Sequence, residues 1–434
     1  MTENTSPLTR LNIFSLKGVQ MRSFHITWLT FFICFFGWFG LAPLMPAIKD
    51  NLHLTKSQIG NIVIASVSGT IIARLVIGRL CDTWGPRKTY TTLLLIGAIP
   101  VMCVGLAKDY NSFLLFRLAI SVIGASFVIT QFHTSMMFAP DIKGTANAVA
   151  GGWGNLGGGV TNMVMPLVFA AIVGLGYTQA EAWRYAMILP GVLMLIAAFF
   201  YYRFTKDTPA GNYDEINRSQ PTKKTKTDYS VLKDRRIWAL SLAYAMGFGM
   251  EITFDNVAAL HFTQNYNLSL SAAGFWAGMF GMMNLFARAL GGIFADTIGR
   301  KYGMRGKGLF LAAMLLLEGF SLILFAKAGS LPFAIISMIS FALFLKMANG
   351  ATYAMTPFIN TKNVGLISGI VGAGGNIGGM LFGFLFKSKT ISYGEAFSYI
   401  GFMVIAASVI ILFTRFAKQE AAAPVATNLN PAVS

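Results

Sequence analysis

Charged residues are scarce in this sequence. Asp, Glu, Lys and Arg make up 12% of its 434 residues, whereas they make up roughly 25% of soluble domains. Hydrophobic residues reach 55%, so the chain cannot cover a folded core with an ordinary water-exposed surface. This composition excludes a typical soluble domain and predicts an integral protein of the lipid bilayer.

Cysteines are few, and the recognisable chemistry of enzymes is missing. Cys34, Cys81 and Cys103 are odd in number and have no metal-ligand spacing, so we expect neither a disulfide framework nor a metal site. No nucleophile, base and orienting acid recur together, and no phosphate-binding loop of the Walker type is present. We therefore expect no enzyme activity, no cofactor and no direct use of ATP.

Acidic residues are half as frequent as basic ones, 17 against 34, which gives a net charge of +17. If the amino terminus is cytoplasmic, 23 of the Lys and Arg fall in inside segments and seven in outside loops, which leaves four within the membrane. This asymmetry is the positive-inside pattern of multi-pass proteins. It predicts a plasma (inner) membrane protein with both termini in the cytoplasm, and it needs no nucleic-acid partner.

Long apolar runs dominate the rest of the chain. About 20 apolar residues suffice to cross a bilayer as a helix, and these runs do not alternate as membrane strands do. We therefore predict an all-α protein with twelve spans, near 26–47, 58–78, 90–107, 112–138, 146–174, 184–203, 237–262, 271–294, 308–326, 331–357, 364–386 and 395–414. The corresponding domains are a cytoplasmic tail, a six-helix bundle, a cytoplasmic linker, a second bundle and a second tail, over residues 1–24, 25–203, 204–236, 237–416 and 417–434.

A glycine-asparagine motif occurs twice, 221 positions apart, in the fifth and eleventh runs. Gly-Asn-x-Gly-Gly begins at Gly154 and Asn155 in one copy and at Gly375 and Asn376 in the other. Glycines in a membrane helix allow close packing. The amides must find partners inside the membrane, so Asn155 and Asn376 are expected to form a symmetric pair that binds something at the midline.

A second repeated motif follows the second and eighth runs, 214 positions apart. Gly-x-x-x-Asp-x-x-Gly and nearby basic residues include Asp82 and Arg87 in one copy and Asp296 and Arg300 in the other. The motif resembles the cytoplasmic loop signature of the major facilitator superfamily. The resemblance implies two pseudo-symmetric six-helix bundles that rock around a midplane site, with the two aspartates and the basic residues, Lys88 and Lys301 included, as gating latches.

Two of the four intramembrane cations are symmetric. Arg74 and Arg288 each lie four residues before the loop motif, and a guanidinium in hydrocarbon needs a cavity or a partner. The alternative is an ion pair with Glu251, Asp255 or Glu318, none of which forms a matching symmetric pair. Arg117 lies near a helix end, where it is expected to snorkel to the interface.

At this point the sequence resembles the nitrate/nitrite porter family. The similarity is carried by the run from Ala42 to Leu52, by Ala65-Ser-Val-Ser-Gly-Thr with Arg74, and by the doubled glycine-asparagine motif. The resemblance implies that Arg74 and Arg288 clamp the anion and that Asn155 and Asn376, with Gly154 and Gly375, line the site. It also implies that Phe127 and Phe248 stack on the two faces of the ion and that Tyr244 donates a hydrogen bond. For the three aromatic residues, plain packing is the alternative.

The seventh run places four polar or aromatic residues on one helical face. Tyr244, Phe248, Glu251 and Asp255 recur at intervals of four, three and four. This pattern resembles the high-affinity, eukaryotic-type nitrate transporters, which implies proton symport. Glu251 is then the candidate proton carrier, and a structural salt bridge to an arginine is the alternative.

Several roles stay open in the sequence. Lys346 and Glu318 are able to neutralise each other, Asp255 has no assigned role, and His133 is expected to be a packing residue. The expected function is secondary transport of nitrate, and of nitrite as well, by proton-coupled uptake through a monomer, with an accessory protein not excluded. Nitrate/nitrite antiport, transport of another small anion such as a carboxylate, and a non-transporting anion receptor are the alternatives.

Overall fold

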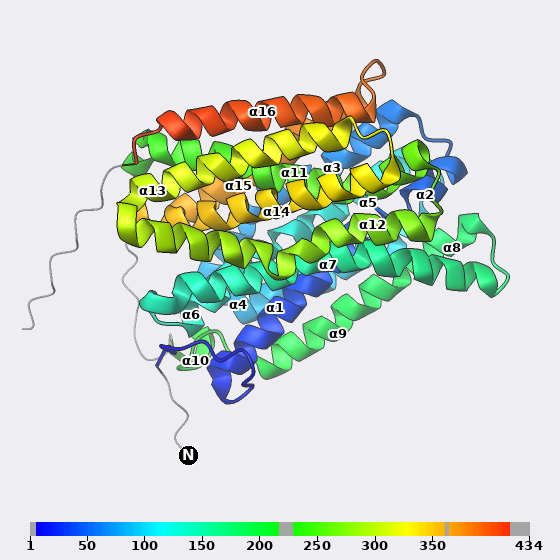
Figure 1. The fold of residues 1–434 in the computed structure, drawn as a ribbon. Coiled ribbons are helices and arrows are strands. Elements are labelled where there is room, and N and C mark those ends of the chain that lie inside the picture. The colour runs from blue at the N-terminus through cyan, green and yellow to red at the C-terminus, as the bar shows by residue number, and fades with distance from the viewer. Residues whose placement is uncertain (1–5, 217–228, 361–363, 417–434) are drawn as a thin grey trace, which may run out of the picture.

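The computed structural model describes residues 6–216, 229–360 and 364–416, and within them all regular elements are helices (Figure 1). Parts of the predicted tails and linker, at 1–5, 217–228 and 417–434, lie outside the described residues. The first half contains α1 Gly18–Phe39, α2 Met45–Asn51, α3 Lys56–Trp84, α4 Pro86–Cys103, α5 Tyr110–Ser121, α6 Ser126–Met137, α7 Pro140–Gly174, α8 Gln179–Ala186 and α9 Ile188–Phe204. The second half contains α11 Arg235–Tyr266, α12 Leu270–Met282, α13 Ala287–Ala326, α14 Leu331–Met355, α15 Val364–Lys387 and α16 Tyr393–Phe413, and the short α10 Tyr213–Ile216 precedes it.

The twelve-span prediction is confirmed in the described residues. Ten helical segments are long and apolar enough to cross a membrane, and one of them, Leu270–Ala326, has 57 residues. At 1.5 Å per residue it would extend about 85 Å, far more than a hydrocarbon core of about 30 Å. The chain turns at Gly303, whose φ is 65°, so this segment crosses twice, and α1 supplies the remaining span.

At one end of the bundle, several helices start with the N-capping residues that the sequence supplies. Four helices that start there, α3, α5, α8 and α16, begin with a capping box, in which an N-cap side chain and the third helical residue satisfy each other's backbone amides: Thr55 with Gln58, Asp109 with Ser112, Thr178 with Glu181 and Ser392 with Glu395. We call this end of the molecule the capped end. The repeated aspartate-glycine motifs lie at the opposite end, where α3 and α13 continue past the predicted span limits through Asp82 and Asp296.

The two halves touch closely near the capped end. A Cβ on Gly60 of α3 would lie 2.3 Å from the Lys387 Cα of α15, and a Cβ on Gly274 of α12 would lie 2.3 Å from the Asn162 carbonyl oxygen of α7. Only glycine permits such an approach of backbones. Lys56 also donates a hydrogen bond to the Ile391 carbonyl across this boundary. The halves are therefore closed at the capped end.

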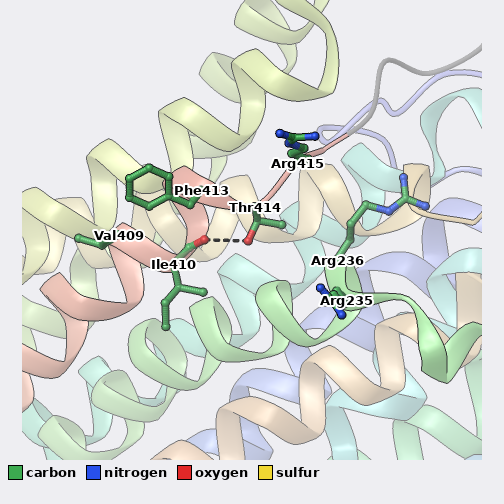
Figure 2. A pocket seen from close by; sticks show the side chains of 7 residues that line it. All are labelled: Arg235, Arg236, Val409, Ile410, Phe413, Thr414 and Arg415. Atoms are coloured by element: carbon green, nitrogen blue, oxygen red, sulfur yellow. Dashed lines mark hydrogen bonds between the residues drawn. The ribbon is translucent and has the colours of Figure 1, made fainter.

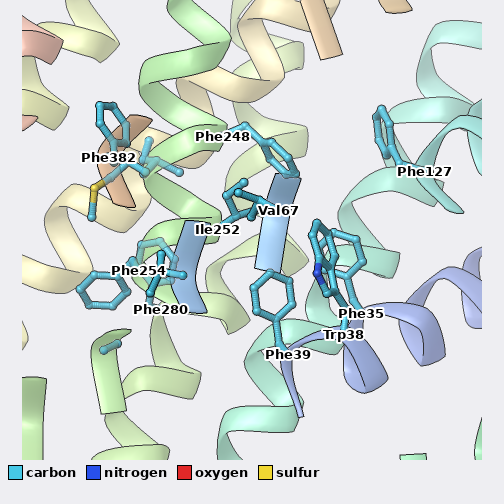
Figure 3. Close-up of a cluster of buried hydrophobic side chains, with 14 of the residues drawn as sticks. Phe35, Trp38, Phe39, Val67, Phe127, Phe248, Ile252, Phe254, Phe280 and Phe382 are labelled. Carbon is cyan, nitrogen blue, oxygen red and sulfur yellow. The ribbon is translucent and has the colours of Figure 1, made fainter. Parts of the chain in front are cut away.

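Aromatic side chains of both halves share one buried cluster (Figure 3). Phe35, Trp38 and Phe39 come from α1, and Phe248 and Phe254 come from α11. Large apolar side chains such as Leu75 and Phe413, each 78% exposed, point outward instead. An apolar exterior around an aromatic core is the arrangement that a lipid environment favours.

Candidate functional site

Arg74 of α3 is buried, and it reaches across to the second half. Its Nη1 donates a hydrogen bond to the carbonyl oxygen of Gly372 on α15 at 2.5 Å. Its guanidinium carbon lies 5.5 Å from the centre of the Phe127 ring. The Nε atom has no hydrogen-bond partner among the described residues. Arg74 thus keeps donor capacity free in a dry environment, where an unused donor is costly.

Arg288 of α13 occupies the corresponding position in the second half. Its Nη2 donates to the Tyr244 hydroxyl at 2.8 Å, while its Nη1 lacks a partner in the described chain. The rings of Tyr244 and Tyr353 lie 5.8 and 5.9 Å from its guanidinium carbon. None of the ion pairs among described residues includes Arg74 or Arg288. The alternative prediction, an ion pair with a buried carboxylate, is therefore wrong for both arginines.

Tyr353 of α14 belongs to the same site, and the sequence analysis missed it. Its ring lies 5.0 Å from the Tyr244 ring and 6.0 Å from the Phe127 ring. Its buried hydroxyl has no partner among described residues. The Tyr353 hydroxyl and the Arg74 Nη1 both lie 3.1 Å from the point that a Cβ on Gly372 would occupy. Nothing in the sequence separated this tyrosine from the membrane tyrosines that serve as interface anchors.

The repeated asparagines are both buried and both incompletely bonded. The two polar atoms of the Asn155 amide lack partners among the described residues, and so does Oδ1 of Asn376. The Nδ2 of Asn376 donates to the Gly372 carbonyl at 3.3 Å, so this carbonyl serves Asn376 and Arg74 together. Buried amides are normally satisfied. The free atoms of each amide are able to accept or donate hydrogen bonds to a polar ligand.

The glycines of the repeated motif pack against aromatic rings. A Cβ on Gly375 would lie 2.7 Å from the Phe248 ring and 2.8 Å from the Tyr244 ring. These two rings are stacked, with centres 5.0 Å apart and an interplanar angle of 3°. A Cβ on Gly154 would overlap Phe31 at 1.8 Å. Both glycines thus give space to aromatic neighbours.

Glu251 forms a buried ion pair with a lysine. Its Oε1 lies 2.7 Å from Lys346 Nζ. Asn284 donates to Oε1 and Asn349 to Oε2, each at 2.9 Å. The alternative prediction for Glu251, a salt bridge to an arginine, is wrong, because its partner is Lys346. For Lys346, whose role the sequence left open, the partner in this conformation is Glu251 and not Glu318. Lys346 lies on α14 opposite α11, and there it reaches Glu251.

Comparison with known proteins gives the family of this chain. A family model described as Major Facilitator Superfamily matches residues 27–383. The High affinity nitrate transporter 2.5 of Arabidopsis thaliana is 40% identical over 415 residues, which are 94% of this chain and 82% of that protein. The chain belongs to the nitrate/nitrite porter family of the major facilitator superfamily. The Nitrate/nitrite transporter NrtP of Nostoc punctiforme is 27% identical, over 84% of this chain and 86% of that protein.

A solved structure supports the superfamily fold. The xylose transporter XylE from E. coli, described as partially occluded and inward open, aligns with a TM-score of 0.67 at 13% sequence identity, over 91% of this chain and 97% of that one. At this identity the likeness concerns the fold alone. It confirms the prediction of a major facilitator fold with helices in two bundles. The family and the ten long apolar helical segments among the described residues make this member of the nitrate/nitrite porter family a multi-pass membrane protein.

The latch aspartates of this porter have other partners than the sequence analysis expected. Asp296 pairs with Lys307 at 2.6 Å. The two residues meet because the chain turns back at Gly303. The Lys307 side chain packs over Gly299, where a Cβ would lie 2.3 Å from the lysine Cε. Arg300 donates instead to Thr297 at 3.3 Å. The predicted latch of Asp296 with Arg300 and Lys301 concerns the state closed on the cytoplasmic side and stays a prediction.

The first copy of the motif differs in the same way. Asp82 is exposed and has no ion pair or hydrogen bond in the described part of the chain. The Arg87 amide donates to Asp207 at 2.8 Å, where Gly85 leaves room for the carboxylate, and Lys88 pairs with Asp214. Burial raises the pKa of the Asp207 carboxyl, and amide hydrogen bonds from Arg87 and Tyr213 oppose that effect. The predicted latch of Asp82 with Arg87 and Lys88 likewise stays a prediction for the state closed on the cytoplasmic side.

Arg117 and His133 resolve into structural roles. Arg117 of α5 is 1% exposed, so the snorkelling prediction is wrong. It donates to the Trp38 carbonyl at 2.9 Å and to Asn256 of α11 at 2.7 Å, and so links the two halves. The buried His133 contacts the Tyr201 hydroxyl at 2.5 Å and the Lys206 carbonyl at 2.7 Å. A packing role for the histidine agrees with these contacts.

A hollow at the end of the second half is separate from this site. Figure 2 shows it between the start of α11 and the end of α16, lined by Arg235, Arg236, Arg415 and apolar side chains. Arg236 is already paired with Asp234 at 2.7 Å. None of the predicted site residues lines the hollow, so it does not compete with Arg74 and Arg288 as the anion site of the porter.

Proposed function

We propose that this protein is a secondary transporter that moves nitrate, and also nitrite, across the plasma membrane by alternating access. The observation that carries the proposal is the pair Arg74 and Arg288, two buried guanidinium groups from opposite halves with unused donors and no carboxylate partner. A buried charge is costly unless it is paired. Relatives named as nitrate transporters make nitrate the first candidate for the missing anion.

The chemistry of the site suits a small planar anion. Each guanidinium is a planar fork of donors that matches planar oxyanions. Asn155, Asn376 and Tyr353 supply further hydrogen bonds from buried groups with free polar atoms. The Phe127 ring beside Arg74 adds a flat wall. We assign these residues, together with Tyr244 and Phe248, to the nitrate site, with Gly154 and Gly375 as supports of its aromatic walls.

The boundary between the halves supports alternating access. The glycine contacts at Gly60 and Gly274 join the halves at the capped end, whereas Gly144 of α7 and Gly369 of α15, toward the opposite end, are exposed with no described atom within 4 Å of a built Cβ. Placing both termini in the cytoplasm by the positive-inside rule makes the opposite end cytoplasmic. Rocking of residues 25–203 against 237–416, with Asp82 and Asp296 in the cytoplasmic gate, would then expose the site alternately.

Uptake of an anion into a negative cell interior needs an energy source, because each charge costs about 2.3 kcal/mol per 100 mV. We assign this role to proton symport, with Glu251 as the proton acceptor, and we expect a monomer to suffice. Protonation of Glu251 would release Lys346 and raise the positive potential beside Arg288. A second candidate is nitrate/nitrite antiport, in which Glu251 stays ionised and paired with Lys346 throughout the cycle. The ion pair and the two amide hydrogen bonds favour this candidate, because they stabilise the ionised form of Glu251.

Labelled nitrate uptake into proteoliposomes tests these two functions. With an inward proton gradient and no internal nitrite, a symporter accumulates nitrate, and Glu251→Gln removes the dependence on the gradient. With internal nitrite and no gradient, an antiporter takes up nitrate. Absence of nitrate flux under both conditions would contradict the proposed substrate.

Tyr353→Phe should weaken nitrate binding. Removing the hydroxyl deletes one hydrogen bond to the anion, worth about 1 kcal/mol, so we expect a rise of about fivefold in the KM for nitrate uptake. The matched control is Tyr399→Phe, because Tyr399 on α16 is 47% exposed on the outer surface. An unchanged KM in the Tyr353 variant would remove this residue from the site.

A further inference from the structure

A buried polar cluster fills the middle of the second half. It contains Glu251 of α11, Lys346 of α14 and Glu318 of α13, with Asn284 and Asn349 as amide donors to Glu251. We call these five residues the acid–lysine cluster. All are at most 2% exposed, so no water shell stabilises their charges. Which of the two carboxyl groups is charged therefore depends on the contacts inside the cluster.

Glu318 differs from Glu251 in having no partner. It is completely buried, and both of its carboxyl oxygens lack a hydrogen bond to any described residue. An ionised carboxylate without a partner costs several kcal/mol in such a place. Glu251, by contrast, accepts from two amides and pairs with Lys346. In this conformation Glu251 is therefore the ionised acid and Glu318 the neutral, proton-bearing one.

Lys346 and Glu318 lie on neighbouring helices, because α14 packs against α13. The Lys346 ammonium has three N–H donors but a single carboxylate contact, at Glu251 Oε1. Its Nζ also lies 4.2 Å from the centre of the Phe280 ring, which supports a cation without fixing the direction of its N–H bonds. In this conformation Lys346 pairs with Glu251 alone, and two of its three N–H donors have no carboxylate partner among the described residues.

The other charged groups around the cluster are few. On α11, Asp255 lies one helical turn after Glu251, and on α13, Arg288 is the next charged residue after Asn284. α12 contributes the Phe280 ring, and the turn after it contributes Asn284. On α16, which packs against α13, the acid Glu395 lies at the exposed start of the helix. Asn284 lies four residues before Arg288 in the chain, in the short turn that leads into α13, so the cluster adjoins the anion site.

We propose that Glu318 is a second proton-binding site of the transport cycle and that Lys346 moves between Glu251 and Glu318. The inference rests on the proposed proton-coupled function. A proton that binds Glu251 breaks its ion pair, and the Lys346 ammonium turns to Glu318. The Glu318 proton then leaves, and a Lys346–Glu318 pair replaces the first pair. One proton enters the cluster and one leaves it, so its net charge is the same before and after.

The test compares Glu318→Gln with the wild type in proteoliposomes. Glutamine matches the neutral acid in shape, so we expect the variant to fold and to retain nitrate counterflow, in which labelled external nitrate exchanges with unlabelled internal nitrate. Accumulation driven by a proton gradient should fall at least tenfold. Glu395→Gln, at the exposed start of α16, is the matched control and should accumulate nitrate normally. Accumulation at the wild-type level in Glu318→Gln would overturn the proposal.

Infrared spectroscopy measures the protonation of Glu318 directly, and a merely structural role would not change that signal during transport. The wild type should show the carbonyl band of a protonated carboxylic acid that disappears in Glu318→Gln, persists in Asp255→Asn and weakens when nitrate and protons are supplied together. A carbonyl band that is lost in Glu318→Gln but is insensitive to transport conditions in the wild type would overturn the proposal, and so would a wild type that shows no band of a protonated carboxylic acid. Absence of nitrate counterflow in the wild type would instead contradict the proposed function itself.

Discussion

Replacing Arg74 or Arg288 with lysine is expected to lower nitrate uptake by about 10- to 100-fold while the protein still inserts in the membrane. Lysine keeps the positive charge but replaces a planar fork with a point charge. The loss of one charge-assisted hydrogen bond, about 1.5 to 3 kcal/mol, corresponds to this range. The measurement is kcat/KM for labelled nitrate in proteoliposomes that contain equal amounts of each variant.

Arg79→Lys provides the matched control on the same helix as Arg74. Arg79 is exposed, so this substitution should leave uptake unchanged. If Arg74→Lys and Arg288→Lys transport nitrate as the wild type does, the two guanidinium groups do not bind the anion.

The largest stability effect is expected for Lys346→Met. The substitution leaves the Glu251 carboxylate buried beside an apolar side chain, and breaking one partner from a buried pair costs about 3 to 5 kcal/mol. The free energy of unfolding of the purified protein in detergent should fall by that amount. The double variant Lys346→Met with Glu251→Gln should recover most of the loss, because no unpaired charge remains.

Lys327→Met controls for the loss of a lysine as such. Lys327 is exposed at the end of α13, and its replacement should change the unfolding free energy by less than about 0.5 kcal/mol. A Lys346→Met protein as stable as the wild type would mean that Glu251 is not ionised in the folded state.

The fold was predictable because its main signals are long and repeated. Apolar runs gave the spans, and the two motifs at offsets of 221 and 214 gave the two halves. Helix ends were harder to place. The run after Leu270 continues as one helical segment until Gly303, because the aspartate-glycine motif is itself helical although it lies beyond the apolar run.

The candidate site was predictable only where symmetry marked it. Arg74 and Arg288 stood out as a matched pair of cations, and the doubled motif singled out Asn155 and Asn376. Tyr353 has no such partner in the other half of the sequence, and only its place beside Phe127 and Tyr244 reveals it.

The partners of the buried charged residues could not be predicted from the sequence. Glu251 and Lys346 are 95 positions apart, and the facing of α11 and α14 brings them together. Arg117 likewise appeared to lie at a helix end, yet packing against α1 and α11 buries it. Helical spacing predicts which residues share a face, but it does not predict which face of another helix they meet.

An experimental structure with bound nitrate would test the central claim most directly. The account predicts a planar anion between Arg74 and Arg288, with guanidinium nitrogens of both residues about 2.7 to 2.9 Å from its oxygens, and with the amide of Asn155 or Asn376 turned toward it. Nitrate bound elsewhere, with both arginines engaged only by protein groups, would contradict the account.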